Sequence, residues 1–329
     1  MGTDRPKALV TAPVRGPGLD KLHELADLVI DPWIDHQPLR IYNAEQLAER
    51  VAAEAATIVV VESDTCGGPL FEQPLIAVAS CRGDPNNVDV EAATAAGVPV
   101  LRAPGRNADA VAELAVGLIL ASTRGLLEAD RDVRTGEIYK DGTIPYQRFR
   151  AWQIAGRTAG LVGLGAVGRA LRWRLEGLGM EVVAYDPYAD DATSSLAELL
   201  AAADVISMHA PVTPETAGMI GAAEFDSMKD GVVFVNTARA QLHDTDALVA
   251  ALASGKVGAA GIDHFVNESL PTDHPLTGFP HVVLAPHIGG ATYDTEANHT
   301  SMVAGDLERL LRGETPLHIV NPEVLLKKA

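Results

Sequence analysis

Cysteine is scarce in this chain, with Cys66 and Cys81 the only two among 329 residues. Two cysteines form neither a disulfide framework nor a metal-binding cluster, and no histidine pair has the spacing of zinc ligands, so we expect no metal. The sequence also lacks any run of about 18 apolar residues, and its first segment is too polar for a signal peptide. We therefore expect a cytoplasmic protein that does not cross a membrane.

Positive charge is also in short supply. The chain has 26 Lys and Arg against 44 Asp and Glu, which gives a formal net charge of -18. Proteins that bind nucleic acids neutralise phosphates with clustered cations, so nucleic acid is a poor partner for this chain. An anionic small molecule would have to be held by a few local arginines against the overall field.

Aromatic residues make up only 5% of the chain, whereas hydrophobic residues make up 47%. This composition, rich in Ala, Val and Leu, suits helices that pack on buried parallel strands. The length exceeds that of one ordinary folding unit, so we expect two domains, each with its own core.

Short β-branched runs alternate with helical stretches along the chain, which predicts parallel sheets. The first series of predicted strands comprises residues 8–11, 57–61, 75–79 and 98–101. A helix is predicted between residues 39 and 56, with Asn43 as its N-cap and Gln46 three residues later. The second series comprises residues 159–162, 181–185, 205–209, 232–236, 259–262 and 282–284. Six strands with intervening helices describe a doubly wound sheet.

After this second series, one more helix is predicted over roughly residues 292–312, followed by an extended tail. This remainder is too short to fold alone, so we infer that it returns to the first unit. The sequence thus predicts an α/β protein in which a doubly wound domain, residues 104–292, is inserted into a smaller flavodoxin-like domain, residues 1–103 and 293–329.

A G-x-G-x-x-G pattern formed by Gly163, Gly165 and Gly168 lies between a predicted strand and a predicted helix. In this context, backbone amides and the helix N-terminus can face a pyrophosphate without obstruction from side chains, which predicts a dinucleotide site. Asp186 ends the next strand, where its carboxylate can accept hydrogen bonds from both ribose hydroxyls. Since no cation follows Asp186 to offset repulsion of a 2′-phosphate, NAD is favoured over NADP.

Further residues after the strands of this domain are predicted to border the cofactor. They are Ala166, Val167, His209, Ala210, Pro211, Thr216, Thr237, Ala238, Asp263 and Gly289.

Three polar residues follow the last strands of the doubly wound domain, and we expect them to meet at the carboxyl edge of the sheet. A guanidinium such as that of Arg239 can bind a carboxylate through two parallel hydrogen bonds. An imidazole such as that of His287 can exchange a proton near neutral pH, and Glu268 can orient it and favour its charged form. This set suits hydride transfer between nicotinamide and C2 of a 2-oxo or 2-hydroxy acid.

Each of these residues also has an ordinary explanation when taken alone. An arginine or glutamate in a loop is usually solvated, and one histidine among ten is usually uninvolved in chemistry. Their joint position behind a dinucleotide motif favours catalysis. His209 is the main alternative proton carrier, but we expect it to line the cofactor pocket.

Several longer motifs together resemble one known family. They are FRAWQIAGRTAGLVGLGAVGRAL, AYDP, SMHAPVTPETAGMIG, MKDGVVFVNTARA, GIDHF followed by Glu268 and Leu270-Pro271, and APHIGGAT. Nearly the whole chain resembles the D-isomer-specific 2-hydroxyacid dehydrogenases. The resemblance implies an inserted NAD domain, a cleft that closes on the substrate, a homodimer formed largely through the NAD domains, and the roles given above to Arg239, Glu268 and His287.

The chain departs from this family at positions that bear on the substrate. Arg82 stands where a glycine of the carboxylate-binding loop is usual, next to Gly83, and His264 replaces a small apolar residue. Arg82 either points to solvent or pairs with Asp84, or it supplies a second cation for a doubly anionic substrate such as phosphonopyruvate or a phosphorylated hydroxy acid.

Two further questions stay open at this point. For Arg148, Arg150 and Trp152, an approach to the cleft of a partner subunit and simple packing are both possible. A regulator that senses NAD(H) and binds a protein partner is the alternative from another functional class.

Overall fold

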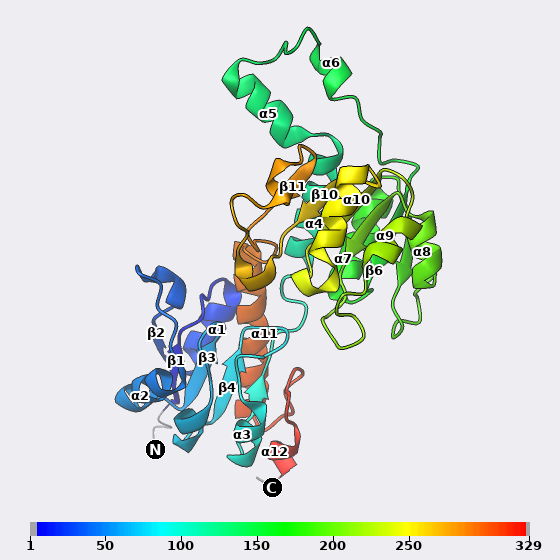
Figure 1. Ribbon diagram of the computed structural model, residues 1–329. Coiled ribbons are helices and arrows are strands. Elements are labelled where there is room, and N and C mark those ends of the chain that lie inside the picture. Colours follow the sequence, from blue (N-terminus) through cyan, green and yellow to red (C-terminus); the bar gives the residue numbers. More distant parts are fainter. Residues whose placement is uncertain (1–4, 327–329) are drawn as a thin grey trace. The chain divides into compact units, whose positions relative to one another are not determined.

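The computed structural model describes residues 5–326 and divides into two compact units. One unit comprises the residues up to Arg106 together with those from Thr292 onward, and the other comprises Asn107–Ala291. Each unit has its own parallel sheet covered by helices on both faces (Figure 1). This is the α/β class with two parallel sheets that the sequence predicts.

The sheet of the first unit has the strand order β2-β1-β3-β4-β5, which is the flavodoxin-like order. Its strands are β1 (Lys7–Val10), β2 (Asp27–Ile30), β3 (Ile58–Val61), β4 (Ala77–Ser80) and β5 (Val100–Leu101). Its helices are α1 (Pro17–Leu25), α2 (Ala44–Glu54), α3 (Val90–Ala95), α11 (Tyr293–Leu311) and α12 (Glu323–Leu326), with 3₁₀-helices η1 (Trp33–Asp35) and η2 (Gly68–Glu72).

Two apolar clusters cover the faces of this first sheet. One lies beneath α2, η2 and α3, and the other beneath α1 and α11. The returning helix α11 contributes Val303, Ala304 and Leu307 to the second cluster, so the C-terminal segment completes the core of the N-terminal unit. The predicted N-cap of α2 is confirmed, because Asn43 and Gln46 form a reciprocal capping box. The sequence patterns did not predict β2, a half-exposed edge strand whose apolar run, residues 28–30, is short.

The sheet of the second unit has the order β11-β10-β9-β8-β6-β7, all parallel. Its strands are β6 (Thr158–Val162), β7 (Glu181–Tyr185), β8 (Val205–Met208), β9 (Val232–Asn236), β10 (Val257–Ile262) and β11 (Val282–Leu284). Its helices are α4 (Ala108–Thr123), α5 (Leu126–Thr135), α6 (Pro145–Arg148), α7 (Ala166–Gly177), α8 (Leu196–Ala202), α9 (Ala222–Ser227) and α10 (Thr245–Ser254). Three 3₁₀-helices complete it: η3 (Ala240–Leu242), η4 (Val266–Glu268) and η5 (Pro275–Gly278).

Helices α4 and α7 cover one face of this second sheet, and α8, α9 and α10 cover the other. The strand order reverses between β6 and β8, which creates a topological switch point at their carboxyl ends. Open α/β sheets bind ligands at such points. The fold therefore puts the loops after β6 and β8 where a ligand is expected.

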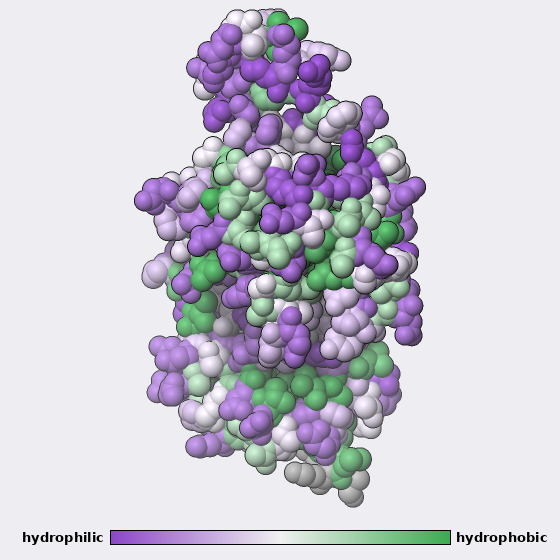
Figure 2. Space-filling model, turned by 45° about the vertical axis from the view of Figure 1, so that its right-hand side comes forward, coloured by the Kyte–Doolittle hydropathy of each residue, from purple (hydrophilic) through white to green (hydrophobic). Residues whose placement is uncertain are grey.

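Among the described residues, no single helix is long and apolar enough to cross a membrane. Helices α4 and α5 would have the length and composition only together, and they meet at a 62° bend. Hydrophilic and hydrophobic residues are interspersed on the face drawn in Figure 2.

Two buried histidines make the fold sensitive to acid. His243 Nδ1 accepts a hydrogen bond from the Asn236 amide, and His299 Nδ1 accepts one from Arg106 while its Nε2 donates to the Pro13 carbonyl. Both arrangements require a neutral ring, and burial lowers the pKa of each histidine to about 4.

We expect the melting temperature to fall as the pH drops from about 6.5 toward 4, because the unfolded chain takes up protons in this window that the folded chain does not. At full effect each histidine contributes about 3 kcal/mol to this loss. Calorimetry from pH 7.5 to 4.5 measures the change, and His299→Gln should flatten it. Replacement of His23, an exposed histidine of α1, is the matched control. A melting temperature that stays constant between pH 6.5 and 5 would contradict the assignment.

Candidate active site

The glycine motif forms the turn between β6 and α7. Gly163 has φ +100°, and a Cβ there would lie 2.6 Å from the Ala210 backbone nitrogen. A Cβ on Gly168 would lie 2.3 Å from the Gly163 carbonyl oxygen, so this glycine permits close packing of strand and helix. Around Gly165, by contrast, a Cβ would meet no atom within 4 Å. The turn therefore keeps open space at the N-terminus of α7, where a pyrophosphate can approach backbone amides.

Asp186 follows β7 and joins that strand to the glycine turn. Its carboxylate accepts hydrogen bonds from the backbone amides of Leu164, at 2.8 Å, and Tyr188, at 2.9 Å. Close by on α7, Arg169 and Arg172 are both engaged by Asp191, Arg169 through a bidentate ion pair. Because both arginines pair with Asp191, their charges are already neutralised and do not offset the repulsion between Asp186 and a 2′-phosphate. The surroundings of Asp186 therefore suit a ribose with free hydroxyls.

Two buried polar atoms at the switch-point side of the sheet have no hydrogen-bond partner within the described chain. They are His209 Nδ1, after β8, and Thr237 Oγ1, after β9. The other ring nitrogen of His209 contacts the Ser207 hydroxyl at 2.9 Å, and burial lowers the pKa of His209 to about 4. Buried polar groups normally find partners, so these two atoms are available to a polar ligand such as a dinucleotide. A neutral, buried His209 is a poor proton carrier.

The remaining residues predicted to border the cofactor lie on the loops of this unit. Thr216 closes the loop after β8 by donating its hydroxyl proton to the Pro211 carbonyl at 2.6 Å. The others are Ala166 and Val167 in the first turn of α7, Ala210 after β8, Ala238 after β9, and Gly289 after β11.

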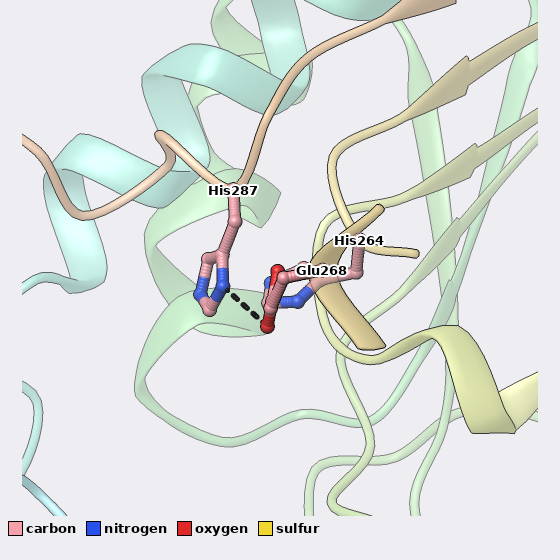
Figure 3. A group of neighbouring side chains, drawn as sticks. All are labelled: His264, Glu268 and His287. Atoms are coloured by element: carbon pink, nitrogen blue, oxygen red, sulfur yellow. Dashed lines mark hydrogen bonds and ion pairs between the residues drawn. The ribbon is translucent and has the colours of Figure 1, made fainter. Parts of the chain in front are cut away.

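His287 and Glu268 form a hydrogen-bonded pair. His287 Nδ1 lies 2.9 Å from Glu268 Oε1, although the two residues come from separate loops after β11 and β10 (Figure 3). Both side chains are substantially exposed, at 44% for His287 and 60% for Glu268. A carboxylate in this position orients the ring and engages Nδ1.

The backbone that presents this pair is strained. Asn267, Glu268 and His287 all have φ between 53° and 55°, a region that residues other than glycine seldom occupy. Such strain persists where surrounding contacts enforce it, and it is concentrated at functional sites.

Asp263 supplies the contacts that enforce the His287 loop. Its carbonyl accepts the His287 amide at 2.8 Å, and its two carboxylate oxygens accept the amides of Ile288 and Gly289 at 2.9 Å each. Burial raises the pKa of the Asp263 carboxyl, although these two amides act in the opposite direction. Sequence analysis assigned Asp263 only to the cofactor and missed this positioning contact, because the bonds join residues about 25 positions apart.

Arg239 is exposed at the end of the loop after β9, and Asn236 builds that loop. The buried Asn236 side chain donates to the Arg239 carbonyl at 2.8 Å and accepts from the Ala238 amide at 3.0 Å. It also contacts His243 Nδ1 at 3.0 Å. Sequence analysis missed Asn236 and His243 as supports of Arg239; the amide at the end of a buried strand was the available signal.

His264 packs directly against the His287 ring. The ring centroids are 3.7 Å apart, and the planes are tilted by 49°. His264 is only 4% exposed. Burial, together with the nearby charges of His287 and Arg239, lowers the pKa of His264 to about 3. The effect of the Arg239 charge on the pKa of His264 indicates that Arg239 lies near His264 and His287.

Arg82 and Gly83 belong to the other unit, in the loop after β4. Arg82 donates through Nε to the Glu62 carbonyl at 2.5 Å and through Nη1 to Asn86 Oδ1 at 2.6 Å. The Arg82 carbonyl accepts the Ala103 amide at 2.7 Å. These contacts tie Arg82 to the segments that follow β3 and β5 as well as to its own loop.

A doubly wound sheet with a G-x-G-x-x-G turn at its switch point and a carboxylate-backed imidazole on the same edge defines a dinucleotide-dependent oxidoreductase. Comparison with known proteins agrees. Residues 116–289 match the family model described as the D-isomer specific 2-hydroxyacid dehydrogenase, NAD binding domain.

Relatives extend this match to the whole chain. A glyoxylate reductase of Thermofilum pendens is 36% identical in an alignment of 331 positions, which covers 98% of this chain and 96% of the relative. A D-3-phosphoglycerate dehydrogenase of Archaeoglobus fulgidus is 38% identical over 244 residues, which cover 72% of this chain and 45% of the relative. The crystal structure of a glyoxylate reductase from Paecilomyes thermophila has a TM-score of 0.75 at 28% identity, covering 97% of this chain and 99% of that one.

The chain therefore belongs to the D-isomer-specific 2-hydroxyacid dehydrogenase family, and it is an NAD-dependent enzyme of that class. The predicted family and the predicted cofactor are confirmed.

Proposed function

We propose that the protein reduces a small 2-oxo acid to a D-2-hydroxy acid, or catalyses the reverse, with Arg239, Glu268 and His287 as its catalytic residues. The observation that carries this proposal is the 2.9 Å contact between His287 and Glu268 at the ligand-binding edge of the sheet. When bound, NADH supplies the hydride that C2 receives. Arg239 grips the substrate carboxylate through two hydrogen bonds and thereby sets which face of C2 is presented.

In this mechanism His287 donates a proton to the oxygen on C2 as negative charge develops there, and takes it back in the oxidative direction. Glu268 stabilises the imidazolium and keeps Nδ1 occupied, so that Nε2 is the nitrogen that faces the substrate. Asp263 and Asn236 act through the backbone: they hold the loops of His287 and Arg239 in position.

The turn residues Gly163, Gly165, Ala166 and Val167 would hold the pyrophosphate, and Asp186 would accept the ribose hydroxyls. His209 and Thr237, whose buried polar atoms need partners, would contact the nicotinamide half. The residues assigned alongside them are Ala210, Pro211, Thr216, Ala238, Asp263 and Gly289. We assign residues 104–292 to the NAD domain and residues 1–103 with 293–329 to the substrate domain.

We further propose a homodimer formed through the NAD domain. The segment from α5 to α6 extends away from the sheet of its own unit (Figure 1). The ion pair between Arg148 and the buried Asp132 holds α6 to α5 at 2.9 Å. Exposed large hydrophobic residues gather on this segment and just after it, and they support its burial by a partner: Leu126, Leu127, Val133, Ile138, Tyr139, Ile144, Tyr146 and Trp152. The two buried cysteines, not joined to each other, suit a cytoplasmic enzyme.

Glyoxylate and hydroxypyruvate are the first substrates to test, because one relative is named a glyoxylate reductase. The experiment is NADH oxidation at 340 nm with a panel of mono- and dianionic 2-oxo acids. Turnover of at least one of them supports the enzyme. Tight NADH binding without turnover of any panel member would favour the NAD(H)-sensing regulator instead.

Glu268→Gln is expected to move the alkaline limb of the pH profile for 2-oxo acid reduction to lower pH. The substitution keeps a hydrogen-bonding oxygen beside His287 Nδ1 but removes the negative charge that favours the imidazolium. The measurement is kcat/KM from pH 5.5 to 9.5, with Glu314→Gln in an exposed loop as the matched control. An unchanged profile would remove Glu268 from the proton-transfer pair.

The second candidate substrate class carries an additional anionic group, which Arg82 and the neighbouring Gly83 backbone would receive. The naming of a relative as a D-3-phosphoglycerate dehydrogenase favours this class. Arg82→Ala should then raise KM for a dianionic substrate at least tenfold more than for glyoxylate, because a charge-assisted hydrogen bond is lost. Equal effects on both substrate types would refute a second anion site at Arg82.

A further inference from the structure

Three potential metal ligands gather at the carboxyl edge of the second unit's sheet. His264, Glu268 and His287 each offer one nitrogen or oxygen, and these atoms all lie within 4.8 Å of one another. The residues come from the loops after β10 and β11, and Figure 3 shows their side chains converging. The sequence did not indicate this set, because His287 lies 19 residues from Glu268 and only the fold brings the two loops together.

The chemistry of the set matches a borderline divalent ion. Imidazole nitrogens and a carboxylate oxygen bind Zn²⁺ at roughly 2.0–2.2 Å. Two such ligands in a tetrahedral site are then separated by roughly 3.4 Å. The contact of 2.9 Å between His287 Nδ1 and Glu268 Oε1 is close to this separation. Both of these side chains are partly exposed and can rotate to admit the ion.

His264 provides an independent observation. The residue as a whole is only 4% exposed, and no hydrogen bond joins its side chain to another residue between 5 and 326. The proton-transfer role assigned to Glu268 and His287 does not use His264, so its ring nitrogens are available to a ligand. Its ring lies against the ring of His287, on the same side as the carboxylate of Glu268 (Figure 3).

We propose that His264, Glu268 and His287 bind Zn²⁺, and that the bound ion inhibits the enzyme. A metal on His287 Nδ1 replaces the hydrogen bond to Glu268 and prevents the ring from becoming an imidazolium. The inhibitory effect, unlike the binding, rests on the proposed function of His287. The net charge of -18 favours cation binding, whereas the nearby Arg239 opposes it, so we expect moderate affinity.

The decisive variant is His264→Leu, which removes one ligand and fills the buried space with an apolar side chain. Calorimetric titration of the full chain with Zn²⁺ alone should give one site per chain, and Co²⁺ should produce visible absorption bands. We expect the Zn²⁺ affinity to fall at least tenfold in His264→Leu and in Glu268→Gln, and the Co²⁺ absorption bands to weaken in both variants. His23→Gln, a control for an exposed histidine, should change neither quantity. Circular dichroism checks that the variants are folded.

Equal Zn²⁺ affinity in the parent and both ligand variants would overturn the site. Inhibition is measured separately, as the Zn²⁺ concentration that halves NADH oxidation. If one ion binds through His264 but the rate does not change, the metal site stands, whereas the catalytic role of His287 and the inhibition both fail.

Discussion

His287→Gln is expected to lower kcat by roughly a hundred- to ten-thousand-fold, which is the usual contribution of a positioned general acid. Glutamine retains a polar group of similar reach but cannot donate a proton to the developing alkoxide. NADH affinity should change little, because the proposed contact of His287 is with the substrate and not with the pyrophosphate at the glycine turn. Steady-state rates and a fluorescence titration of NADH measure the two quantities.

The matched control for this substitution is His23→Gln, which changes an exposed histidine in the other unit. It should leave both quantities as they are in the parent. A kcat for His287→Gln within a few-fold of the parent would show that another group carries the proton.

Arg239→Gln is expected to reduce kcat/KM for the 2-oxo acid by roughly a hundred- to a thousand-fold. The substitution removes a bidentate, charge-assisted pair with the substrate carboxylate, and each factor of ten corresponds to about 1.4 kcal/mol of transition-state stabilisation. Arg239→Lys should recover only part of the loss, because an ammonium keeps the charge but not the planar fork.

Arg312, an exposed arginine at the end of α11, is the matched control, and Arg312→Gln should retain parental kinetics. If Arg239→Gln kept its kcat/KM, or if it lost only NADH affinity, Arg239 would not be the carboxylate-binding group.

The sequence predicted most strands because short apolar, β-branched runs recur between polar turns. Strands β7, β9 and β11 have the bounds expected from hydrophobic runs alone, since each lies between polar turns. The edge strand β2 was missed although residues 28–30 are apolar, because only Ala26 separates it from α1 and no turn residues mark its start. The cofactor turn was predictable because a Cβ at Gly163 or Gly168 would collide with nearby backbone atoms, so the sequence must carry glycine at both positions.

The pairing of Glu268 with His287 was predictable from the sequence, but the contacts that support it were not. The pattern of polar residues after successive strands indicated that Glu268 and His287 would share an edge, and their 2.9 Å contact agrees. The bonds from Asp263 to the His287 loop, and the left-handed backbone at Glu268 and His287, depend on contacts between distant loops. The burial of His264 against His287 depends on tertiary packing in the same way. No local residue preference encodes these features.

Transfer of deuterium to the product from NADH that carries deuterium at both C4 positions of its nicotinamide is the most direct test of the proposed chemistry. With hydroxypyruvate or another accepted 2-oxo acid, we predict that NMR finds the label at C2 of a product with the D configuration only. A product without deuterium at C2, or a racemic product, would contradict a site in which Arg239 fixes the face of the substrate and His287 supplies the proton.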